Sequence, residues 1–316
     1  MMSRPNKVII TGGCGFIGSS VVEQLVIQGY DLLVIDSLVI GSKATLPDPK
    51  KAQLLKADVR ALTEKQLQGF HNAYWVHLAA LPFVPKSFHD PLSFFEINAM
   101  GTAHVCELAI RTSAKRFVLI SSSEVYRSSS KGTKLSEEAP LDPLSPYANS
   151  KLAAEAVVRG FSARGLPCVI LRLFNCYGPR FTHPYFIPEM IKQCLTRREI
   201  HVGSLDTHRD FTYVTDTAEA IALVLPREGI EEETFNIGSG VERQMGEVLE
   251  KIQEVTGRKG KTIIVEASRK RPEGRDPYYL VANTDKAKSL LQWCPRVLFE
   301  DGLYCTVKGI EAALRA

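Results

Sequence analysis

Apolar and polar positions follow two different patterns along the first half of the chain. Short apolar runs, typical of buried strands, are separated by longer segments whose apolar residues recur with helical spacing. We expect strands at residues 7–11, 31–36, 52–58, 73–80, 116–120 and 167–174, and helices at 16–28, 63–69, 91–112 and 146–163. Strands that alternate with helices are typical of a parallel sheet covered on both faces. The pattern therefore predicts an α/β fold with a doubly wound parallel sheet.

The pattern changes after Asn175, where proline and aromatic residues cluster and the apolar runs become shorter. We expect helices near 188–197, up to Leu225, at 244–256 and at the end of the chain, with short strands at 200–202, 235–238 and 262–266. We therefore expect two parts. Residues 1–174, with return segments near 209–240, form the larger domain, and residues 175–316 mainly form a smaller α/β region laid over it.

Composition narrows the class of protein. The 316 residues are 45% hydrophobic and 23% charged, which is typical of a soluble globular chain. The net charge of +4 is spread out, without the dense basic face of a nucleic-acid-binding protein. No apolar run approaches the ~20 residues of a membrane span, and a first strand at Lys7 leaves no room for a signal peptide. The seven cysteines are scattered, so we expect reduced thiols in a cytoplasmic protein, without a disulfide framework or a metal site.

Three glycines separate the first strand from the first helix. Gly12 permits a tight turn, Gly15 allows close approach of a pyrophosphate, and Gly18 allows the helix to pack near the strand. A strand, a glycine turn and a helix form the phosphate-binding unit of Rossmann-type folds, in which the helix N-terminus favours an anion. The glycine spacing alone is equally compatible with a plain loop, so other residues must decide.

The ends of the next strands carry candidate cofactor contacts. Asp36 lies 18 residues beyond Gly18, where an acid accepts hydrogen bonds from the adenosine ribose and favours NAD over NADP. An aspartate that merely caps a turn is the alternative. Asp58 ends the third strand and is a candidate contact to the adenine edge, while the small Ala79 and Ala80 would let a cofactor lie against the fourth strand.

A polar cluster follows the fifth strand, at the edge of the sheet where ligands bind in such folds. It comprises residues 121–126, and the polar loop 127–143 behind it is long enough for a lid. Tyr147 and Lys151 are four residues apart and therefore share one helix face. His77 is interpreted as a core histidine, whereas the buried polar Asn98 needs partners and is either structural or part of a site.

Several motifs occur in order along nearly the whole chain, at residues 11–18, 36, 121–126, 147–151, 171–180 and 209–214. Together they resemble the extended short-chain dehydrogenase/reductase family of nucleotide-sugar epimerases and dehydratases. The resemblance implies an NAD that stays bound and takes up hydride from the sugar C4 only transiently. Tyr147 would be the general base, aided by the positive charge of Lys151, and Ser122 would hydrogen-bond the C4 oxygen.

The resemblance also implies sets of contacts. The cofactor would contact Gly12, Gly15, Phe16, Ile17, Gly18, Asp36, Asp58, Val59, Leu78, Ala79, Ala80, Asn98, Ser121, Tyr147 and Lys151. The nucleotide-diphosphate sugar would contact Ser122, Asn175, Arg209 and Arg271. The planar guanidinium of Arg271 suits a diphosphate, although a solvated loop charge is an equally open alternative.

Glu124 decides which reaction we expect. A carboxylate there can remove the C5 proton of a 4-keto sugar and drive loss of water, so the resemblance implies a 4,6-dehydratase with Ser122, Ser123, Glu124, Tyr147 and Lys151 as catalytic residues. Ser123 replaces an aspartate of many dehydratases, and Arg127 replaces a usual glycine. The alternatives are a 4-epimerase with a structural Glu124, a UDP-glucuronate decarboxylase, and a dinucleotide-binding module without catalysis. The resemblance also bears on the substrate and on assembly. Similarity to N-acetylhexosamine dehydratases at 203–210 and 271–273 favours a UDP-sugar. By the same resemblance, helices 91–112 and 146–163 would form a homodimer interface.

Overall fold

The structure is a computed structural model that describes residues 6–43, 46–47, 50–180 and 183–315. The first five residues, parts of the predicted loop 37–50 and of the proline-rich segment 177–188, and residue 316 lie outside the described part.

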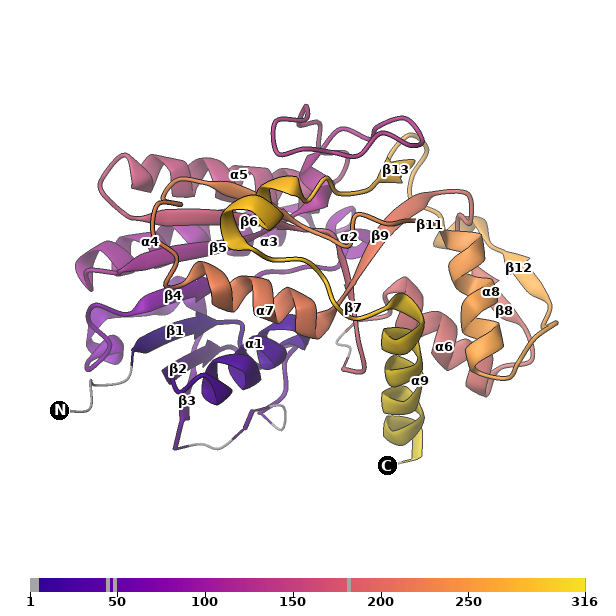
Figure 1. The fold of residues 1–316 in the computed structure, drawn as a ribbon, viewed down its shortest axis with the longest axis horizontal. Helices are drawn as coiled ribbons and strands as arrows, with labels where there is room; N and C mark the ends of the chain where they lie inside the picture. Colours follow the sequence, from indigo (N-terminus) through magenta and orange to yellow (C-terminus); the bar gives the residue numbers. More distant parts are fainter. Residues whose placement is uncertain (1–5, 44–45, 48–49, 181–182, 316) are drawn as a thin grey trace.

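A seven-stranded parallel sheet forms the centre of the larger part (Figure 1). Its strand order is β10-β6-β5-β4-β1-β2-β3. The strands are β1 (Lys7–Thr11), β2 (Asp31–Asp36), β3 (Ala52–Lys56), β4 (Tyr74–His77), β5 (Arg116–Ser122), β6 (Cys168–Leu173) and β10 (Thr234–Ile237). Because β1 lies between β2 and β4, the sheet order reverses there, and a crevice at this switch point is where ligands bind in open α/β sheets. The α/β fold predicted from the sequence is confirmed.

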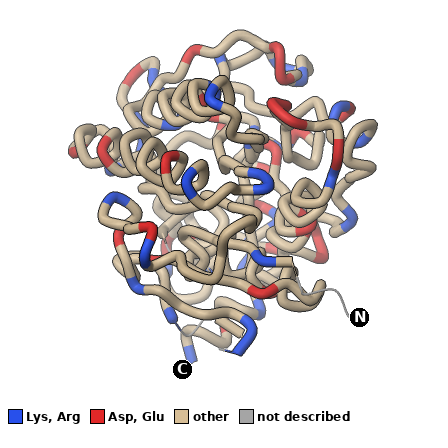
Figure 2. Tube along the Cα trace, turned by 90° about the vertical axis from the view of Figure 1, so that its left-hand side faces the viewer, with Lys and Arg blue, Asp and Glu red and all other residues tan. Residues whose placement is uncertain are grey.

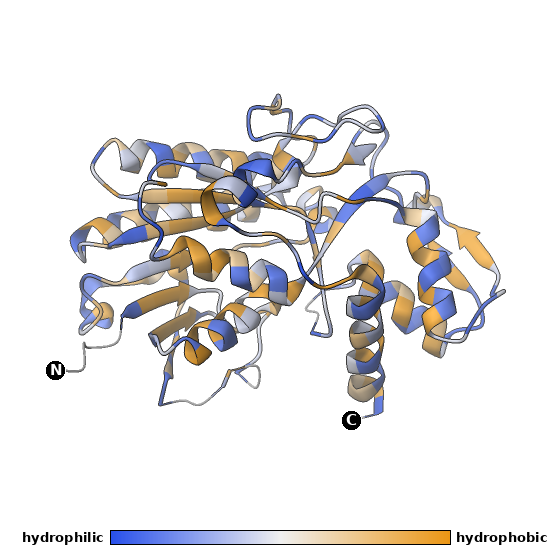
Figure 3. Ribbon diagram, in the orientation of Figure 1, coloured by the Kyte–Doolittle hydropathy of each residue, from blue (hydrophilic) through white to orange (hydrophobic). Residues whose placement is uncertain are grey.

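Helices cover both faces of this sheet. Helices α1 (Phe16–Ile27) and α7 (Val214–Val224) pack on one face, and α4 (Gly101–Arg111) and α5 (Pro146–Ser162) pack on the other. The central strands are apolar along their length, whereas the helices carry polar residues on their outer sides (Figure 3). Such strands, buried on both faces, explain why the sequence shows continuous apolar runs rather than alternation.

The predicted helix 91–112 is not regular. It consists of α3 (Pro91–Phe95), a π-helical turn at Glu96–Met100, and α4. The turn contains Asn98, whose amide donates to the Leu81 carbonyl (3.1 Å) and accepts from the Leu81 N–H (2.7 Å). The same amide donates to Ser150 Oγ of α5 (2.9 Å), and the short helix α2 (Val84–Ser87) follows the Leu81 segment. A π turn of this kind often marks a functional region.

The chain after β6 forms a second body beside the sheet (Figure 1). A four-stranded sheet contains β7 (Asn175–Tyr177), β9 (His208–Tyr213), β11 (Glu242–Gln244) and β13 (Tyr279–Leu280), and a two-stranded sheet contains β8 (Ile200–Val202) and β12 (Ile263–Val265). The helices of this body are α6 (Phe186–Thr196), α8 (Met245–Val255) and α9 (Phe299–Arg315). They enclose their own apolar core. Segments α7 and β10 return to the large sheet.

Figure 2 shows acidic and basic residues interspersed along the chain in the view it presents. Within the described ranges, every helix is too short or too polar to cross a bilayer. Cys14, Cys106, Cys168 and Cys194 are buried, and no disulfide joins any two cysteines of the described part of the chain. No group of metal-binding side chains large enough to hold an ion occurs among the described residues.

Candidate active site

A cavity of about 630 Å³ extends from the glycine turn, across the ends of β4 and β5, to the second body. Every sequence-predicted site residue except Asn98 lines it. The predicted cofactor contacts among them are Gly12, Gly15, Phe16, Ile17, Gly18, Asp36, Asp58, Val59, Leu78, Ala79, Ala80, Ser121, Tyr147 and Lys151. The predicted catalytic and substrate residues that join Tyr147 and Lys151 are Ser122, Ser123, Glu124, Asn175, Arg209 and Arg271.

The glycine turn leaves no room for side chains. Gly12 has φ +74°, and a Cβ there would lie 2.7 Å from the Ala79 nitrogen. A Cβ on Gly18 would lie 2.2 Å from the Gly12 carbonyl oxygen. Helix α1 begins after Gly15 without a side-chain cap, so its first N–H groups face the cavity with the positive end of the helix dipole. This cradle fits the pyrophosphate of a dinucleotide.

Asp36 ties the end of β2 to this turn. Its carboxylate accepts from the N–H of Cys14 (3.0 Å) and of Leu38 (2.8 Å). The side chain therefore caps a turn, as the alternative interpretation required, and also lines the cavity where a ribose would bind. Asp58 accepts from the Arg60 N–H and pairs with its guanidinium at 2.7 Å, and these hydrogen bonds lower the pKa of Asp58.

Asn98 and His77 are structural in this arrangement. The Asn98 side chain hydrogen-bonds to Leu81 and Ser150 and is not among the residues that line the cavity, which agrees with the structural role that the sequence left open. A contact between Asn98 and the cofactor stays a prediction. His77 lies in the core between the hydroxyls of Thr11 (2.7 Å) and Thr102 (3.0 Å). Burial lowers the pKa of His77 to about 3, so the ring is neutral, and its interpretation as a core histidine is confirmed.

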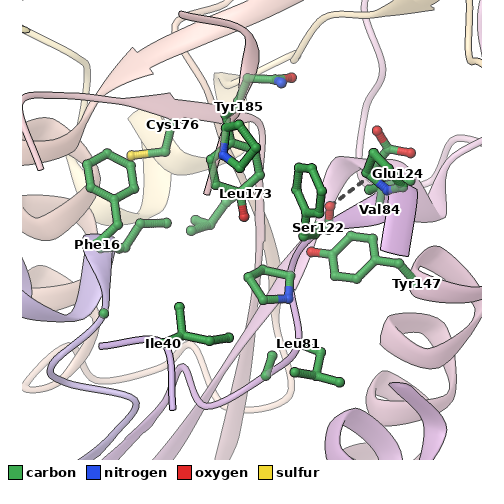
Figure 4. A pocket seen from close by; sticks show the side chains of 18 of the residues that line it. Phe16, Ile40, Leu81, Val84, Ser122, Glu124, Tyr147, Leu173, Cys176 and Tyr185 are labelled. Carbon is green, nitrogen blue, oxygen red and sulfur yellow. Dashed lines mark hydrogen bonds between the residues drawn. The ribbon is translucent and has the colours of Figure 1, made fainter. Parts of the chain in front are cut away.

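Ser122, Tyr147 and Lys151 all line the cavity. Ser122 ends β5, and Tyr147 opens α5 after the N-cap Ser145 and Pro146, a sequence that favours a helix start. Figure 4 shows the Tyr147 hydroxyl directed toward Ser122, with Phe16 and Cys176 on the opposite wall. Burial raises the pKa of Tyr147 to about 12, and a hydrogen bond with Ser122 offsets only part of this effect. Burial lowers the pKa of Lys151 to about 8.

Glu124 is not a free carboxylate. Arg271 donates from Nη1 and Nη2 to its two oxygens, each at 2.8 Å, and both side chains are largely buried. Burial alone would raise the pKa of Glu124, but Arg271 and Arg209 outweigh it and hold the pKa below its usual value. The Glu124 N–H also donates to Ser122 Oγ at 3.2 Å (Figure 4).

A second acid, which sequence reasoning missed, links the two arginines. Asp276 lines the cavity, accepts from Arg209 at 2.8 Å and lies 3.4 Å from Arg271 Nε. Glu124, Arg271, Asp276 and Arg209 therefore form a chain of alternating charges. In the sequence Asp276 is one of two acids within the basic loop 268–277. Only its contacts in the structure assign it to the cavity. Tyr185 was missed as well and forms part of the cavity wall (Figure 4).

Arg127 lies outside this arrangement. Its guanidinium pairs with Asp142 at 3.3 Å, its side chain is 63% exposed, and it does not line the cavity. Arg127 therefore faces solvent in this structure.

The fold and the site together define a class of protein: an enzyme-like α/β protein with a dinucleotide cradle and a tyrosine–lysine pair on one helix beside it. A family model described as GDP-mannose 4,6 dehydratase matches residues 9–306. The chain belongs to this family and hence to the extended short-chain dehydrogenase/reductases, which confirms the resemblance inferred from the motifs.

Individual relatives carry out different reactions. The chain is similar to the putative UDP-glucose 4-epimerase of Methanocaldococcus jannaschii, with 30% identity over 96% of this chain and 98% of that one. It is 31% identical to the UDP-N-acetyl-alpha-D-glucosaminuronate decarboxylase of Bacillus cytotoxicus, over 96% of this chain and 97% of that one. It also resembles DesIV, a dTDP-glucose 4,6-dehydratase from Streptomyces venezuelae solved with NAD, at TM-score 0.88 and 30% identity over 97% of each chain. The family is one of NAD-dependent nucleotide-sugar enzymes.

Proposed function

We propose that the protein is an NAD-dependent nucleotide-sugar 4,6-dehydratase. The observation that carries the proposal is Glu124, a buried carboxylate adjacent to Ser122 in the cavity that Tyr147 and Lys151 line. A base in addition to the tyrosine is what elimination needs and simple epimerisation does not. Relatives in the family include dehydratases, epimerases and a decarboxylase, so the choice among them is ours.

Different residues of the chain bind the cofactor and the substrate. The glycine turn, Asp36 and the strand ends at Asp58 and Ala79 hold NAD, which when bound supplies a hydride acceptor and donor. Residues 175–316 mainly hold the nucleotide diphosphate, with Arg209 and Arg271 supplying the positive charge and Asn175 a further contact.

Tyr147 accepts the proton of the C4 hydroxyl. Because burial alone leaves the phenol protonated, it needs cationic neighbours to act near neutral pH, and Lys151 supplies one from its own helix face. Ser122 holds the C4 oxygen by a hydrogen bond. The pocket wall around Leu81 and Tyr185 keeps water from the keto sugar.

Glu124 then accepts the C5 proton. Because Ser123 carries no carboxylic proton, Glu124 returns that proton to the C6 hydroxyl, which leaves as water. The hydride taken from C4 returns to C6 of the resulting ene, and C5 takes up a proton in place of the one that Tyr147 accepted, so that hydride and protons balance. The ion pair with Arg271 opposes this role, since it lowers the basicity of Glu124. The same ion pair favours the second candidate, a 4-epimerase in which Glu124 only orients Arg271.

Mass spectrometry of products from a panel of UDP-, dTDP- and GDP-sugars tests the proposal. Loss of water identifies a dehydratase, loss of carbon dioxide a decarboxylase, and unchanged mass with changed retention an epimerase. Absence of turnover and of any sugar-dependent absorbance of reduced cofactor identifies a non-catalytic module. Glu124→Gln should abolish loss of water, and Arg127→Gln, on an exposed site, should not. An E124Q variant with intact turnover would end the dehydratase proposal.

We further propose a UDP-sugar as substrate, a cytoplasmic location and a homodimer. Two of the relatives bear UDP-sugar names. The dimer proposal rests on apolar side chains that α3 and its π turn leave exposed, Leu92 (74%) and Met100 (66%), beside α5.

A further inference from the structure

A buried ion pair lies directly behind the catalytic cluster, and the mechanism above does not use it. Glu155 follows Lys151 by one turn of α5 and pairs with Arg172 of β6, with side-chain exposures of 2% and 3%. Arg172 donates from Nε to Oε1 of Glu155 at 3.0 Å and from Nη2 to Oε2 at 2.7 Å. The two planar groups therefore meet in a bidentate pair inside the protein.

This pair joins the elements that carry the catalytic residues. Ser121 of β5 and Arg172 of β6 are in register, and Ser121 Oγ donates to Glu155 Oε1 at 2.5 Å. Ser121 immediately precedes Ser122, while Glu155 lies on the helix of Tyr147 and Lys151. Glu155 thus connects the end of β5 to α5 through a direct hydrogen bond.

The third nitrogen of Arg172 extends the contacts to the loop 127–143. Arg172 Nη1 donates to the Tyr126 hydroxyl (2.9 Å) and to the Glu137 carbonyl (3.1 Å). Tyr126 in turn donates to Asn236 Oδ1 of β10 at 2.7 Å. Both charges are therefore satisfied by fixed partners on β5, β6, α5 and the loop.

The energetic cost of such a pair points to a positional role. Replacing a buried ion pair by apolar residues of similar size is often neutral or stabilising, so stability alone does not account for it. We propose that Glu155 and Arg172 are positioning residues that hold Ser122 of β5 in place against Tyr147 and Lys151 of α5. This inference rests on the roles of those three residues in the proposed function.

The double variant Glu155→Leu/Arg172→Met tests the proposal, because it removes both charges while roughly keeping volume. We expect thermal unfolding close to that of the wild type, KM for the nucleotide sugar little changed, and kcat reduced roughly tenfold to a hundredfold by misplacement. Glu155→Gln, which keeps shape and an acceptor, is the second variant if the double variant folds poorly, and a smaller fall in kcat is expected.

Arg116→Met is the matched control. Arg116, like Arg172, is a buried arginine, but it begins β5, at the end of that strand far from Ser122, and its Nη1 donates to the carbonyl oxygens of Val224 and Leu225. Its loss should lower the unfolding temperature and leave kcat and the pH profile unchanged.

A pH profile separates positioning from general loss of structure. Glu155 is the charge that opposes the effect of burial on the pKa of Lys151. Tyr147 and His77 are two further titratable neighbours, and burial keeps both uncharged near neutral pH. In the double variant, the basic limb of kcat should therefore move to lower pH.

A crystal structure of the double variant provides the readout that is independent of activity. We expect the distance between Ser122 Oγ and the Tyr147 hydroxyl to change by roughly 1 Å, the scale at which misplacement affects catalysis. An unchanged distance, or wild-type kcat with an unshifted basic limb, overturns the inference. A wild-type protein without turnover on the sugar panel contradicts the proposed function instead, and the distance still decides the positioning role.

Discussion

The guanidinium of Arg271 meets the carboxylate of Glu124 through two hydrogen bonds of 2.8 Å, although the residues lie 147 positions apart. From the sequence we expected Arg271 to bind the diphosphate and Glu124 to act on the sugar. Under the proposed function the ion pair would couple the two tasks: a diphosphate that attracts Arg271 would also release Glu124 and raise its basicity.

Arg271→Met should move the acid limb of kcat/KM to higher pH. Burial raises the pKa of Glu124, and Arg271 and Arg209 together hold it below its usual value. Removal of Arg271 leaves only Arg209 to oppose burial, so the pKa of Glu124 rises. Glu124 would then lose its charge at a higher pH. The ion pair stabilises the fold above the unfolded pKa of the carboxyl and ceases to do so as pH falls through the folded pKa. Loss of stability on the order of 3 kcal/mol near neutral pH is therefore expected, shrinking in acid.

Rate profiles and thermal unfolding measured against pH check this expectation, with Arg127→Met as the control. Arg127 pairs with Asp142 at the surface, so its variant should match the wild type. If the acid limbs of wild type and R271M coincide, the ion pair does not set the pKa of Glu124.

Lys151 should set a basic limb near pH 8. Burial lowers its pKa from 10.5 to about 8, so the ammonium that supports Tyr147 is lost as pH rises through that value. Lys151→Met should lack this limb and react roughly a hundredfold to ten-thousandfold more slowly. Because the unfolded chain still holds the proton between pH 8 and 10.5, stability should rise with pH across that window relative to K151M. A basic limb in K151M at the wild-type position contradicts the assignment.

Much of the candidate site could be predicted from local sequence spacing, whereas the rest depends on contacts between residues far apart in the sequence. Gly12 and Gly18 are readable because their turn is closed within a few residues, and Tyr147 and Lys151 because a helix places them on one face. The partners of Asn98 could not be read from the sequence, because Leu81 lies 17 residues away and Asn98 itself lies in a π turn that no local pattern indicates.

The short strands of the second body were missed for a related reason. Strands β7, β11 and β13 are two or three residues long, too short for a hydrophobic period. They exist because each pairs with a neighbour, β9, that lies far away in the sequence. The strand predicted at 235–238 was found, but its place at the edge of the large sheet follows from pairing with β6.

Leu92→Glu/Met100→Glu should produce a monomer if α3 and α5 form the dimer interface. Leu92 is 74% and Met100 66% exposed, and charges at the centre of an apolar interface are costly to bury. Light scattering after size-exclusion chromatography measures the mass. Ile27→Glu, at an 81% exposed position at the end of α1, should leave the mass unchanged. A wild-type monomer, or a dimer that survives both charges, refutes this interface.

Gly18→Ala should empty the dinucleotide cradle. The new methyl group would lie 2.2 Å from the Gly12 oxygen, a backbone atom that cannot move without opening the turn. We expect a loss of stability of about 1–3 kcal/mol, measured by thermal unfolding. We also expect the wild type to retain NAD through purification and the variant to lose it, measured by chromatography of the released nucleotide. Gly160→Ala is the matched control, because nothing lies within 4 Å of its Cβ and the residue is exposed on α5. It should stabilise the helix by about 1 kcal/mol and retain NAD. Equal NAD content in both variants would show that the close approach at Gly18 is not what holds the cofactor.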